Sequence, residues 1–250
     1  MLLVLDIGNT QTVCGLYRGK SLLYFKRVET RKILRGLRVI LSPKFCHPER
    51  SEGSLSSIIM AIHIASVVPS LNVKLKKKLK AQFKTKNIHF LSHRSKLPIK
   101  LNVKYPKEVG ADRLSNMTAA VKAYRAPVLI IDFGTATTID YVDSKNRYQG
   151  GVIMPGLKTA MDALFQKAEK LKPVPLHFPR TSIGKTTKEQ LQIGAILAHV
   201  EMVEGMVRRM RKETKTHAKI ILTGGWAGLI SKHLTLKHIH DPYLTLKGLR

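Results

Sequence analysis

The sequence of 250 residues predicts an α/β fold with mixed sheets, assembled from two similar halves. The first observation is a repeat, because residues 4–12 (VLDIGNTQT) and 130–138 (IIDFGTATT) both contain an apolar run, an Asp-x-Gly turn and a hydroxyl-rich stretch. This pattern is typical of a buried strand, a tight turn and a second strand. The second observation is a similar strand-to-glycine junction at residues 220–225 (IILTGG). Helical periodicity lies between these junctions, and the alternation of strands and helices indicates the α/β class.

Three segments have the apolar spacing of a helix, at residues 112–124, 156–171 and 187–212. The first begins with an acidic residue, and the second follows a Pro-Gly turn. The third begins with residues 187–190 (TKEQ) and continues with an apolar stripe. This start matches a capping box and predicts Thr187 as the capping residue.

Residues 6–10 (DIGNT) form the first candidate site. The glycine lets the backbone approach a phosphate closely, the following Asn and Thr offer polar groups, and the aspartate can hold Mg²⁺ or its water shell. One such turn is common at strand ends. The second copy at residues 132–138 gives two turns, which together predict a phosphate clamp. At residues 224–225 the paired glycines leave room for the flat ring of an adenosine.

Two other nucleotide motifs are excluded. Residues 184–186 (GKT) resemble the end of a P-loop, but Pro179 stands where the P-loop needs a glycine. No GxGxxG motif occurs, so a Rossmann dinucleotide site has no support.

Residues 110–113 (GADR) lie at the start of a predicted helix. In one interpretation Asp112 caps the helix and Arg113 faces solvent. In the other, Asp112 is the general base for a substrate hydroxyl and Arg113 binds an anionic substrate group in bidentate fashion. Phosphoryl transfer depends mainly on positioning and charge neutralisation, so one carboxylate and one metal ion suffice for it.

The chain has 44 Lys+Arg against 16 Asp+Glu, a formal net charge of +28. Residues 31–100 hold 16 of the basic and two of the acidic residues, so their net positive charge per residue is more than twice that of the rest of the chain. Such charge favours anionic ligands or polyanions but does not determine a fold. Residues 74–80 (KLKKKLK) are interpreted as the solvated face of a helix, with nucleic-acid contact as the alternative.

Several classes are excluded. Cys14 and Cys46 form no CxxC pair, which excludes a disulfide scaffold and a zinc ribbon. Residues 238–240 (HIH) are interpreted as a half-exposed strand, and residues 42–54 as an irregular loop. The apolar run at residues 1–5 is too short for a signal peptide, and no run reaches the length of a membrane span. We therefore expect a cytoplasmic protein with no membrane contact.

Six motifs together resemble those of type III pantothenate kinase, the first enzyme of coenzyme A synthesis. They are residues 6–10 (DIGNT), 110–113 (GADR), 132–138 (DFGTATT), 151–156 (GVIMPG), 184–187 (GKTT) with Gly194, and 223–225 (TGG). The resemblance implies the duplicated actin-like, acetate and sugar kinase and Hsp70 fold, which is ribonuclease H-like. It also implies ATP, Mg²⁺, a monovalent cation (K⁺ or NH₄⁺), pantothenate as substrate, and a homodimer.

The resemblance also implies roles for single residues. ATP would be bound by Asp6, Ile7, Gly8, Asn9, Thr10, Gln11, Thr12, Val13 and Thr135. Pantothenate would be bound by Gly110, Ala111, Asp112, Arg113 and Thr187, the last from the partner subunit or the dimer edge. Asp112 would accept the proton of the pantothenate hydroxyl, and Asp132 would hold the monovalent cation. The expected halves are residues 1–113, with the ATP phosphate turn at 6–13, and residues 114–250, with the second phosphate turn at 132–138 and the adenosine-side turn at 223–225.

The chain departs from the family pattern at three places. Val103 stands where a tyrosine is usual, with Tyr105 two residues closer to Asp112, Trp226 follows the glycine pair, and residues 46–54 have no counterpart. Two alternatives remain open: the same fold with a sugar or a carboxylic acid as acceptor, and a nucleic-acid-binding or transcription accessory protein. We expect no nucleic-acid partner, because a binding module has no need of two phosphate turns and a placed carboxylate.

Overall fold

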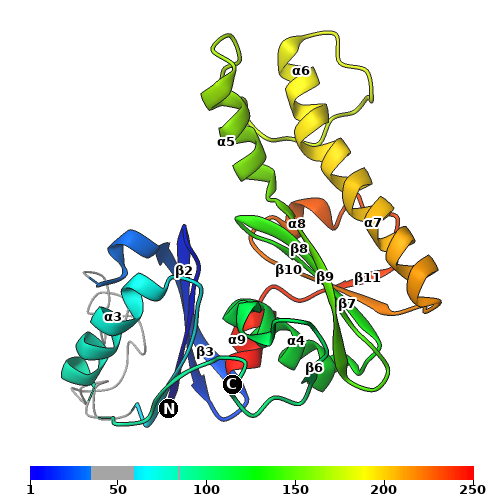
Figure 1. The fold of residues 1–250 in the computed structure, drawn as a ribbon. Helices are drawn as coiled ribbons and strands as arrows, with labels where there is room; N and C mark the ends of the chain where they lie inside the picture. The colour runs from blue at the N-terminus through cyan, green and yellow to red at the C-terminus, as the bar shows by residue number, and fades with distance from the viewer. Residues whose placement is uncertain (35–58, 84) are drawn as a thin grey trace. The chain divides into compact units, whose positions relative to one another are not determined.

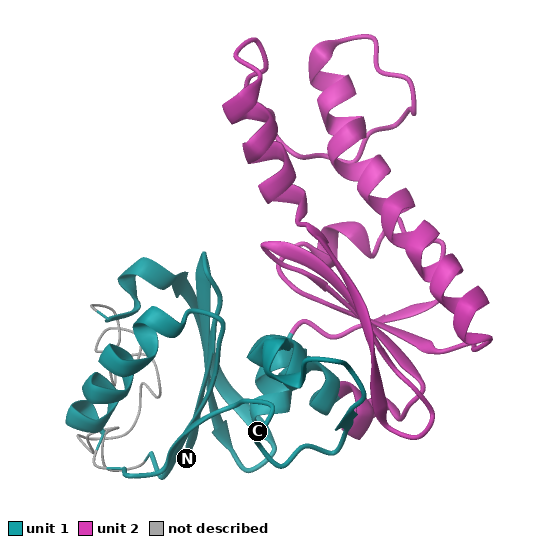
Figure 2. Cartoon of the chain, viewed as in Figure 1, with its two compact units in different colours: residues 1–119, 243–250 teal, residues 120–242 magenta. Residues whose placement is uncertain are grey.

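The computed structural model describes residues 1–34, 59–83 and 85–250 (Figure 1). The chain divides into two compact units, the first Met1–Ala119 with Tyr243–Arg250 and the second Ala120–Pro242 (Figure 2). The expected boundary after residue 113 lies inside helix α4 (Ala111–Tyr124). The predicted irregular loop at 42–54 lies outside the described residues.

Unit 1 is built on a mixed sheet with the strand order β3-β2-β1-β4-β5. Antiparallel pairing joins β1 to β2 and β2 to β3, whereas β4 runs parallel to β1 and β5 parallel to β4. The strands are β1 (Leu2–Ile7), β2 (Gln11–Arg18), β3 (Ser21–Glu29), β4 (Ala61–Ser66) and β5 (Ile88–Phe90). Short elements complete the unit: a 3₁₀ turn (Thr30–Lys32), α3 (Pro69–Gln82), β6 (Lys100–Leu101), a 3₁₀ turn (Pro106–Glu108) and α9 (Leu244–Leu249).

Strand β1 lies in the middle of this sheet, and both of its faces are buried. Successive side chains of the strand alternate between those faces. On one face, Leu3 and Leu5 pack in a cluster that includes Leu75 of α3. On the other face, Val4 packs in a cluster with Leu246 of α9. The lysines of residues 74–80 surround the buried Leu75 on α3, so this segment is the predicted helix with a solvated face.

Unit 2 repeats this plan. Its own strands follow the order β11-β10-β7-β8-β9, with β7 antiparallel to β8 and parallel to β10. They are β7 (Val128–Phe133), β8 (Ala136–Val142), β9 (Arg147–Pro155), β10 (Lys219–Thr223) and β11 (His238–His240). Thus β7 and β8 correspond to β1 and β2, and the duplicated α/β fold with mixed sheets is confirmed.

The helices of unit 2 are α5 (Leu157–Lys167), α6 (Thr187–Gln192), a π-helical segment (Ile193–Leu197), α7 (Ala198–Thr214) and α8 (Ala227–Ile230). The predicted helix at 187–212 is therefore one helical run that contains a π segment. No helix among residues 1–34, 59–83 and 85–250 is long and apolar enough to cross a membrane.

The expected cap at Thr187 is wrong by one residue. Thr186 is extended and its hydroxyl accepts the N–H of Glu189, while the Glu189 carboxylate accepts the N–H of Thr186. A glutamate at the third helical position closes the box better than Gln190, because its ionised carboxylate also accepts the N–H of Lys185 at the positive end of the helix. Thr187 is thereby left exposed on the first turn.

Candidate functional site

The first candidate phosphate turn connects β1 to β2. Gly8 N–H donates to the Gln11 carbonyl (3.0 Å), which closes the turn, and Asn9 is exposed on it. From beneath, the Thr30 hydroxyl donates to the Gly8 carbonyl (2.6 Å), and Thr30 N–H donates to the Thr10 carbonyl (3.0 Å). The turn is therefore held from below and presents its polar residues outward.

Three of the residues expected at ATP, Ile7, Thr12 and Val13, lie in the two strands that flank this turn. Ile7 and Thr12 are buried, and the Thr12 and Thr30 hydroxyls share a hydrogen bond of 3.0 Å. Val13 is half-buried, and Gln11 is exposed. The side chains of Ile7 and Thr12 accordingly support the turn, while the exposed positions can face a ligand.

Asp6 lies at the end of β1 and is half-buried. Burial and the neighbouring Asp6 carboxylate raise the pKa of the Cys14 thiol to about 12. Cys14 is therefore a neutral packing residue, and it takes no part in nucleophilic chemistry.

The GADR segment lies at the same edge of the unit 1 sheet. Val67 N–H donates to the Ile7 carbonyl (3.0 Å), extending the parallel pairing beyond β4. A Cβ placed on Gly110 would lie 3.5 Å from Cγ1 of Val67. Unit 1 thus brings the start of α4 next to the residues that flank the first phosphate turn.

Helix α4 begins at Ala111, which is buried against the sheet, so Asp112 lies within the first turn rather than at the cap. Its Oδ1 accepts the N–H of Arg113 (2.8 Å). A Cβ at Gly110 would lie 2.6 Å from this oxygen, so the carboxylate takes up space that only a glycine leaves.

The second candidate phosphate turn connects β7 to β8. Gly134 N–H donates to the Ala136 carbonyl (3.0 Å), two residues along the chain, whereas Gly8 N–H in the first turn donates to the carbonyl three residues along. Thr135 is exposed, and its carbonyl accepts the N–H of Gly156 (3.0 Å) and the hydroxyl of Thr159 (2.6 Å). The Pro-Gly motif before α5 therefore fixes the backbone of this turn.

Asp132 lies between the second phosphate turn and the glycine pair after β10. It stands opposite Thr223 in the parallel pairing of β7 and β10. Gly224 has a φ of +97°, and a Cβ on it would lie 2.5 Å from the Asp132 Oδ1. Trp226 N–H donates to the Phe133 carbonyl (3.2 Å). Unit 2 thus brings the predicted phosphate and adenosine-side turns into direct contact.

Comparison with known proteins identifies the family. The model of a family described as type III pantothenate kinase matches residues 2–209. The chain is 41% identical over 252 residues to the type III pantothenate kinase of Geotalea daltonii, covering 100% of this chain and 96% of the relative. It is 39% identical over 253 residues to that of an Exiguobacterium species, covering 100% and 97%. The chain belongs to the type III pantothenate kinase family.

Solved structures agree on the fold. A Baf family transcriptional activator from Campylobacter jejuni superposes with a TM-score of 0.63 at 17% identity, covering 99% of this chain and 94% of that one. MreB 5 of Spiroplasma citri superposes with a TM-score of 0.51 at 10% identity, covering 99% and 94%. These likenesses confirm the predicted actin-like fold, and family membership makes the chain a kinase.

A histidine that the sequence patterns did not single out supports the second phosphate turn of this family member. His199 Nε2 and the hydroxyl of Thr137 share a hydrogen bond of 3.0 Å, and both side chains are buried. Burial lowers the pKa of His199, which is therefore neutral near pH 7. Its only signal in the sequence is a titratable residue on an otherwise apolar helix face.

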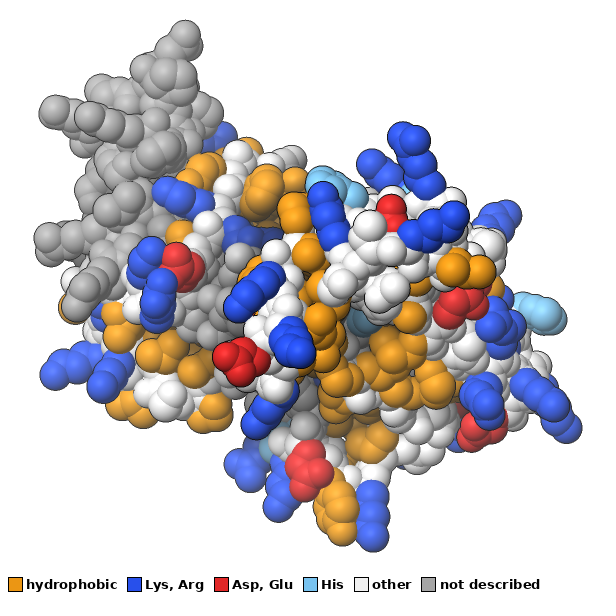
Figure 3. Space-filling model, turned by 90° about the horizontal axis from the view of Figure 1, so that it is seen from above, with side chains coloured by type: hydrophobic (Ala, Val, Ile, Leu, Met, Phe, Trp, Pro, Cys, Tyr) orange, Lys and Arg blue, Asp and Glu red, His pale blue; other side chains and the backbone are white. Residues whose placement is uncertain are grey.

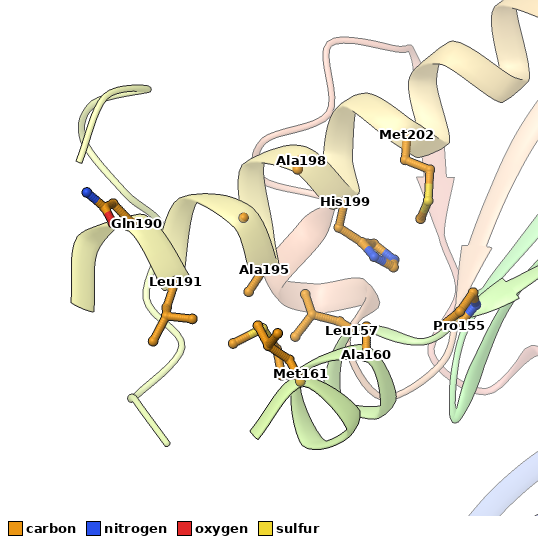
Figure 4. Close-up of a pocket in the computed structure, with 12 residues that line it drawn as sticks. Pro155, Leu157, Ala160, Met161, Gln190, Leu191, Ala195, Ala198, His199 and Met202 are labelled. Atoms are coloured by element: carbon orange, nitrogen blue, oxygen red, sulfur yellow. The ribbon is translucent and has the colours of Figure 1, made fainter. Parts of the chain in front are cut away.

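His199 also lines a cavity of about 470 Å³ between α5 and the helical run 190–202. Figure 4 shows His199 and Met202 projecting from the long helix toward the side on which Leu157 and Met161 of α5 lie. The lining is almost entirely aliphatic and sulfur-containing, so the cavity favours apolar groups.

The described part of the chain contains no group of three or more His, Cys, Asp or Glu residues that could hold a metal. Asp6 and Asp132 are single carboxylates at the two phosphate turns. Mg²⁺ in nucleotide sites is held by one or two carboxylates, water and the phosphates themselves, so these donors fit a nucleotide-bound metal.

Each unit holds its own part of the site predicted for this family. Asp6, Asp112 and Arg113 belong to unit 1, whereas Asp132 and Thr135 belong to unit 2. Thr187 lies on the exposed first turn of α6, in unit 2. On the face seen in Figure 3, Lys and Arg side chains are scattered over the surface, with few acidic ones among them.

Proposed function

We propose that this kinase transfers the γ-phosphate of ATP to the primary hydroxyl of pantothenate, giving 4′-phosphopantothenate and ADP in the first step of coenzyme A synthesis. The identity of 39–41% over the whole chain to relatives named type III pantothenate kinase carries the proposal. Such a step in coenzyme A synthesis is consistent with the expected cytoplasmic location.

ATP would be bound by the two phosphate turns at residues 6–13 and 132–138, with the adenosine against residues 223–225. Support comes from the shared architecture of the turns, in which a glycine N–H closes each hairpin and exposed polar residues follow. Mg²⁺ would be held by Asp6 with the ATP phosphates, and when bound it neutralises charge on those phosphates.

Asp112 would act as the general base. Its Oδ accepts the hydroxyl proton of pantothenate as the hydroxyl oxygen attacks the γ-phosphorus, and the bond from that phosphorus to the bridging oxygen of ADP breaks. The position of Asp112 in the first turn of α4 supports this role, because that turn lies next to the residues that flank the first phosphate turn. Arg113 would bind the carboxylate of pantothenate in bidentate fashion.

Asp132 would hold a monovalent cation, K⁺ or NH₄⁺. Its carboxylate lies between the second phosphate turn and the glycine pair after β10, with Oδ1 close to the backbone of Gly224, and this place beside the proposed nucleotide turns supports the role. Thr187 would contact pantothenate as part of a homodimer, and its exposed position on α6 leaves its hydroxyl accessible to a neighbouring subunit.

The test is an assay that couples ADP release to NADH oxidation, run with pantothenate in the presence and absence of K⁺. We expect turnover that requires pantothenate and increases with K⁺ or NH₄⁺ over Na⁺. Sugars and other hydroxy acids serve as control acceptors, and preferred turnover of one of these would replace the proposed substrate. Absence of turnover with either cation present would reject the kinase reaction proposed for pantothenate.

A further inference from the structure

Helix α9, at the C-terminal end of the described chain, packs directly against α4, the helix that begins with the GADR segment (Figure 1). The Ser115 hydroxyl donates to the Thr245 carbonyl (2.7 Å), and the Thr245 hydroxyl donates to Oδ1 of Asn116 (2.7 Å). Ser115 and Asn116 are 0% and 1% exposed and Thr245 is half-buried, so the α4 side of both hydrogen bonds lies in the interior.

The backbones of the two helices also approach closely. A Cβ placed on Gly248 would overlap the carbonyl oxygen of Ser115 and lie 2.5 Å from its hydroxyl. Only a residue without a side chain permits this approach. The contact and the two hydrogen bonds all fall on Ser115 and Asn116, which lie one helical turn beyond Asp112 and on the same side of α4.

The adjacent side of α9 is fixed to the sheet of unit 1. Leu246 and Leu249 are buried in one cluster with Val4 of β1. His63 Nδ1 of β4 lies 2.6 Å from the Leu249 carbonyl, a hydrogen bond that pairs the end of α9 with a central strand. Helix α9 therefore connects the strand that leads into the first phosphate turn to the helix that carries Asp112.

We propose that α9 positions Asp112 for catalysis, with Thr245 and Gly248 as positioning residues that act through Ser115 and Asn116. This inference rests on the proposed function for the role of Asp112 itself. The first turn of a helix has the fewest backbone hydrogen bonds, so its orientation depends on such side-chain and packing contacts. A misplacement of about 1 Å at a reacting group can reduce a rate about 100-fold.

The experiment compares Thr245→Val, which removes the hydroxyl donor at nearly the same volume, with Thr245→Ser, which keeps it. We expect Thr245→Val to lower kcat about 10- to 100-fold and to raise KM for pantothenate, with KM for ATP unchanged. Thr245→Ser should recover most of the wild-type kcat. Gly248→Ala should act like Thr245→Val, and Gly205→Ala in α7 is its control, because a Cβ at Gly205 meets no atom nearer than 3.8 Å.

Amide hydrogen exchange of residues 111–116 provides a readout that needs no turnover. Faster exchange there in Thr245→Val than in Thr245→Ser supports the proposal. Equal exchange, or a lower melting temperature with unchanged kcat and KM, would show a merely structural contact and overturn it. If the wild-type protein does not phosphorylate pantothenate, the proposed function fails by itself, and the exchange comparison still decides whether α9 positions the first turn of α4.

Discussion

The carboxylate of Asp132 lies so close to the backbone of Gly224 that no side chain fits at position 224. The φ of Gly224 is +97°, and a Cβ there would lie 2.5 Å from Oδ1 of Asp132 and 2.5 Å from the Phe133 nitrogen. The second phosphate turn and the glycine pair after β10 are therefore fitted to each other through bare backbone. A change at Gly224 must move the carboxylate that we propose as the cation ligand.

Gly224→Ala is expected to lower kcat/KM at least 10-fold and to weaken the activation by K⁺. The reason is displacement of Asp132 in addition to backbone strain, since strain at a positive φ alone costs about 1–2 kcal/mol. Gly150→Ala is the matched control, because Gly150 has a φ of +113° and a Cβ there meets nothing within 4 Å. K⁺ titrations of both variants decide the matter. Equal losses in the two would leave strain as the sole cause and remove the link to Asp132.

Asp112→Asn is expected to lower kcat by about 10²- to 10⁴-fold, the usual contribution of a general base. The amide keeps an oxygen that can accept the Arg113 N–H, so the melting temperature should stay close to that of the wild type. Steady-state kinetics and thermal unfolding are measured on the same preparation. Asp162→Asn, which removes an exposed ion pair with Lys158, serves as the control and should leave kcat unchanged. Near-normal kcat in Asp112→Asn would remove this residue from the mechanism.

The sequence predicts the elements that have strong local signals. The repeat at residues 4–12 and 130–138 correctly indicates the central hairpins, because in both copies a short continuous apolar run, typical of a buried strand, is followed by a glycine at the turn. The helix start is misplaced by one residue because residues 186–189 (TTKE) and 187–190 (TKEQ) both fit the capping pattern. Only the backbone geometry selects Thr186.

Features that depend on tertiary contact could not be predicted. The packing of α9 beneath α4 joins residues about 130 positions apart, since |i−j| is 130 for Ser115 and Thr245. No local period indicates such a pair. Likewise, the hydrogen bond between His199 and Thr137 follows from the way in which α7 packs on β8, and a lone histidine on an apolar stripe does not predict its partner.

The stability of the protein should decrease below about pH 6.5 because of His199. Burial lowers the pKa of this imidazole from 6.5, so on acidification the unfolded chain binds a proton before the folded protein does. Linkage then requires that the stability from the neutral His199 is fully present above the unfolded pKa and is lost as the pH falls below it. His199→Gln should reduce this loss, as measured by urea unfolding between pH 8 and 5. His240→Gln on the exposed part of β11 should keep the wild-type slope, and an unchanged slope in His199→Gln would assign the pH dependence to other groups.

Adjacent threonines at the start of α6 allow the structural and the substrate role to be separated. Thr186→Ala should cost about 1 kcal/mol, because the Glu189 N–H loses its acceptor. Thr187→Ala should leave the free energy of unfolding almost unchanged and raise KM for pantothenate, since its hydroxyl lies outside the capping box. Urea unfolding and pantothenate kinetics are compared for both variants, with Thr186→Ser as the control that keeps the cap.

A larger stability loss in Thr187→Ala than in Thr186→Ala would contradict the capping geometry. The cap on Thr186 satisfies the helix end without Thr187, so a change in KM for Thr187→Ala would not arise from a damaged helix start. A wild-type KM in Thr187→Ala would therefore remove Thr187 from the substrate pocket.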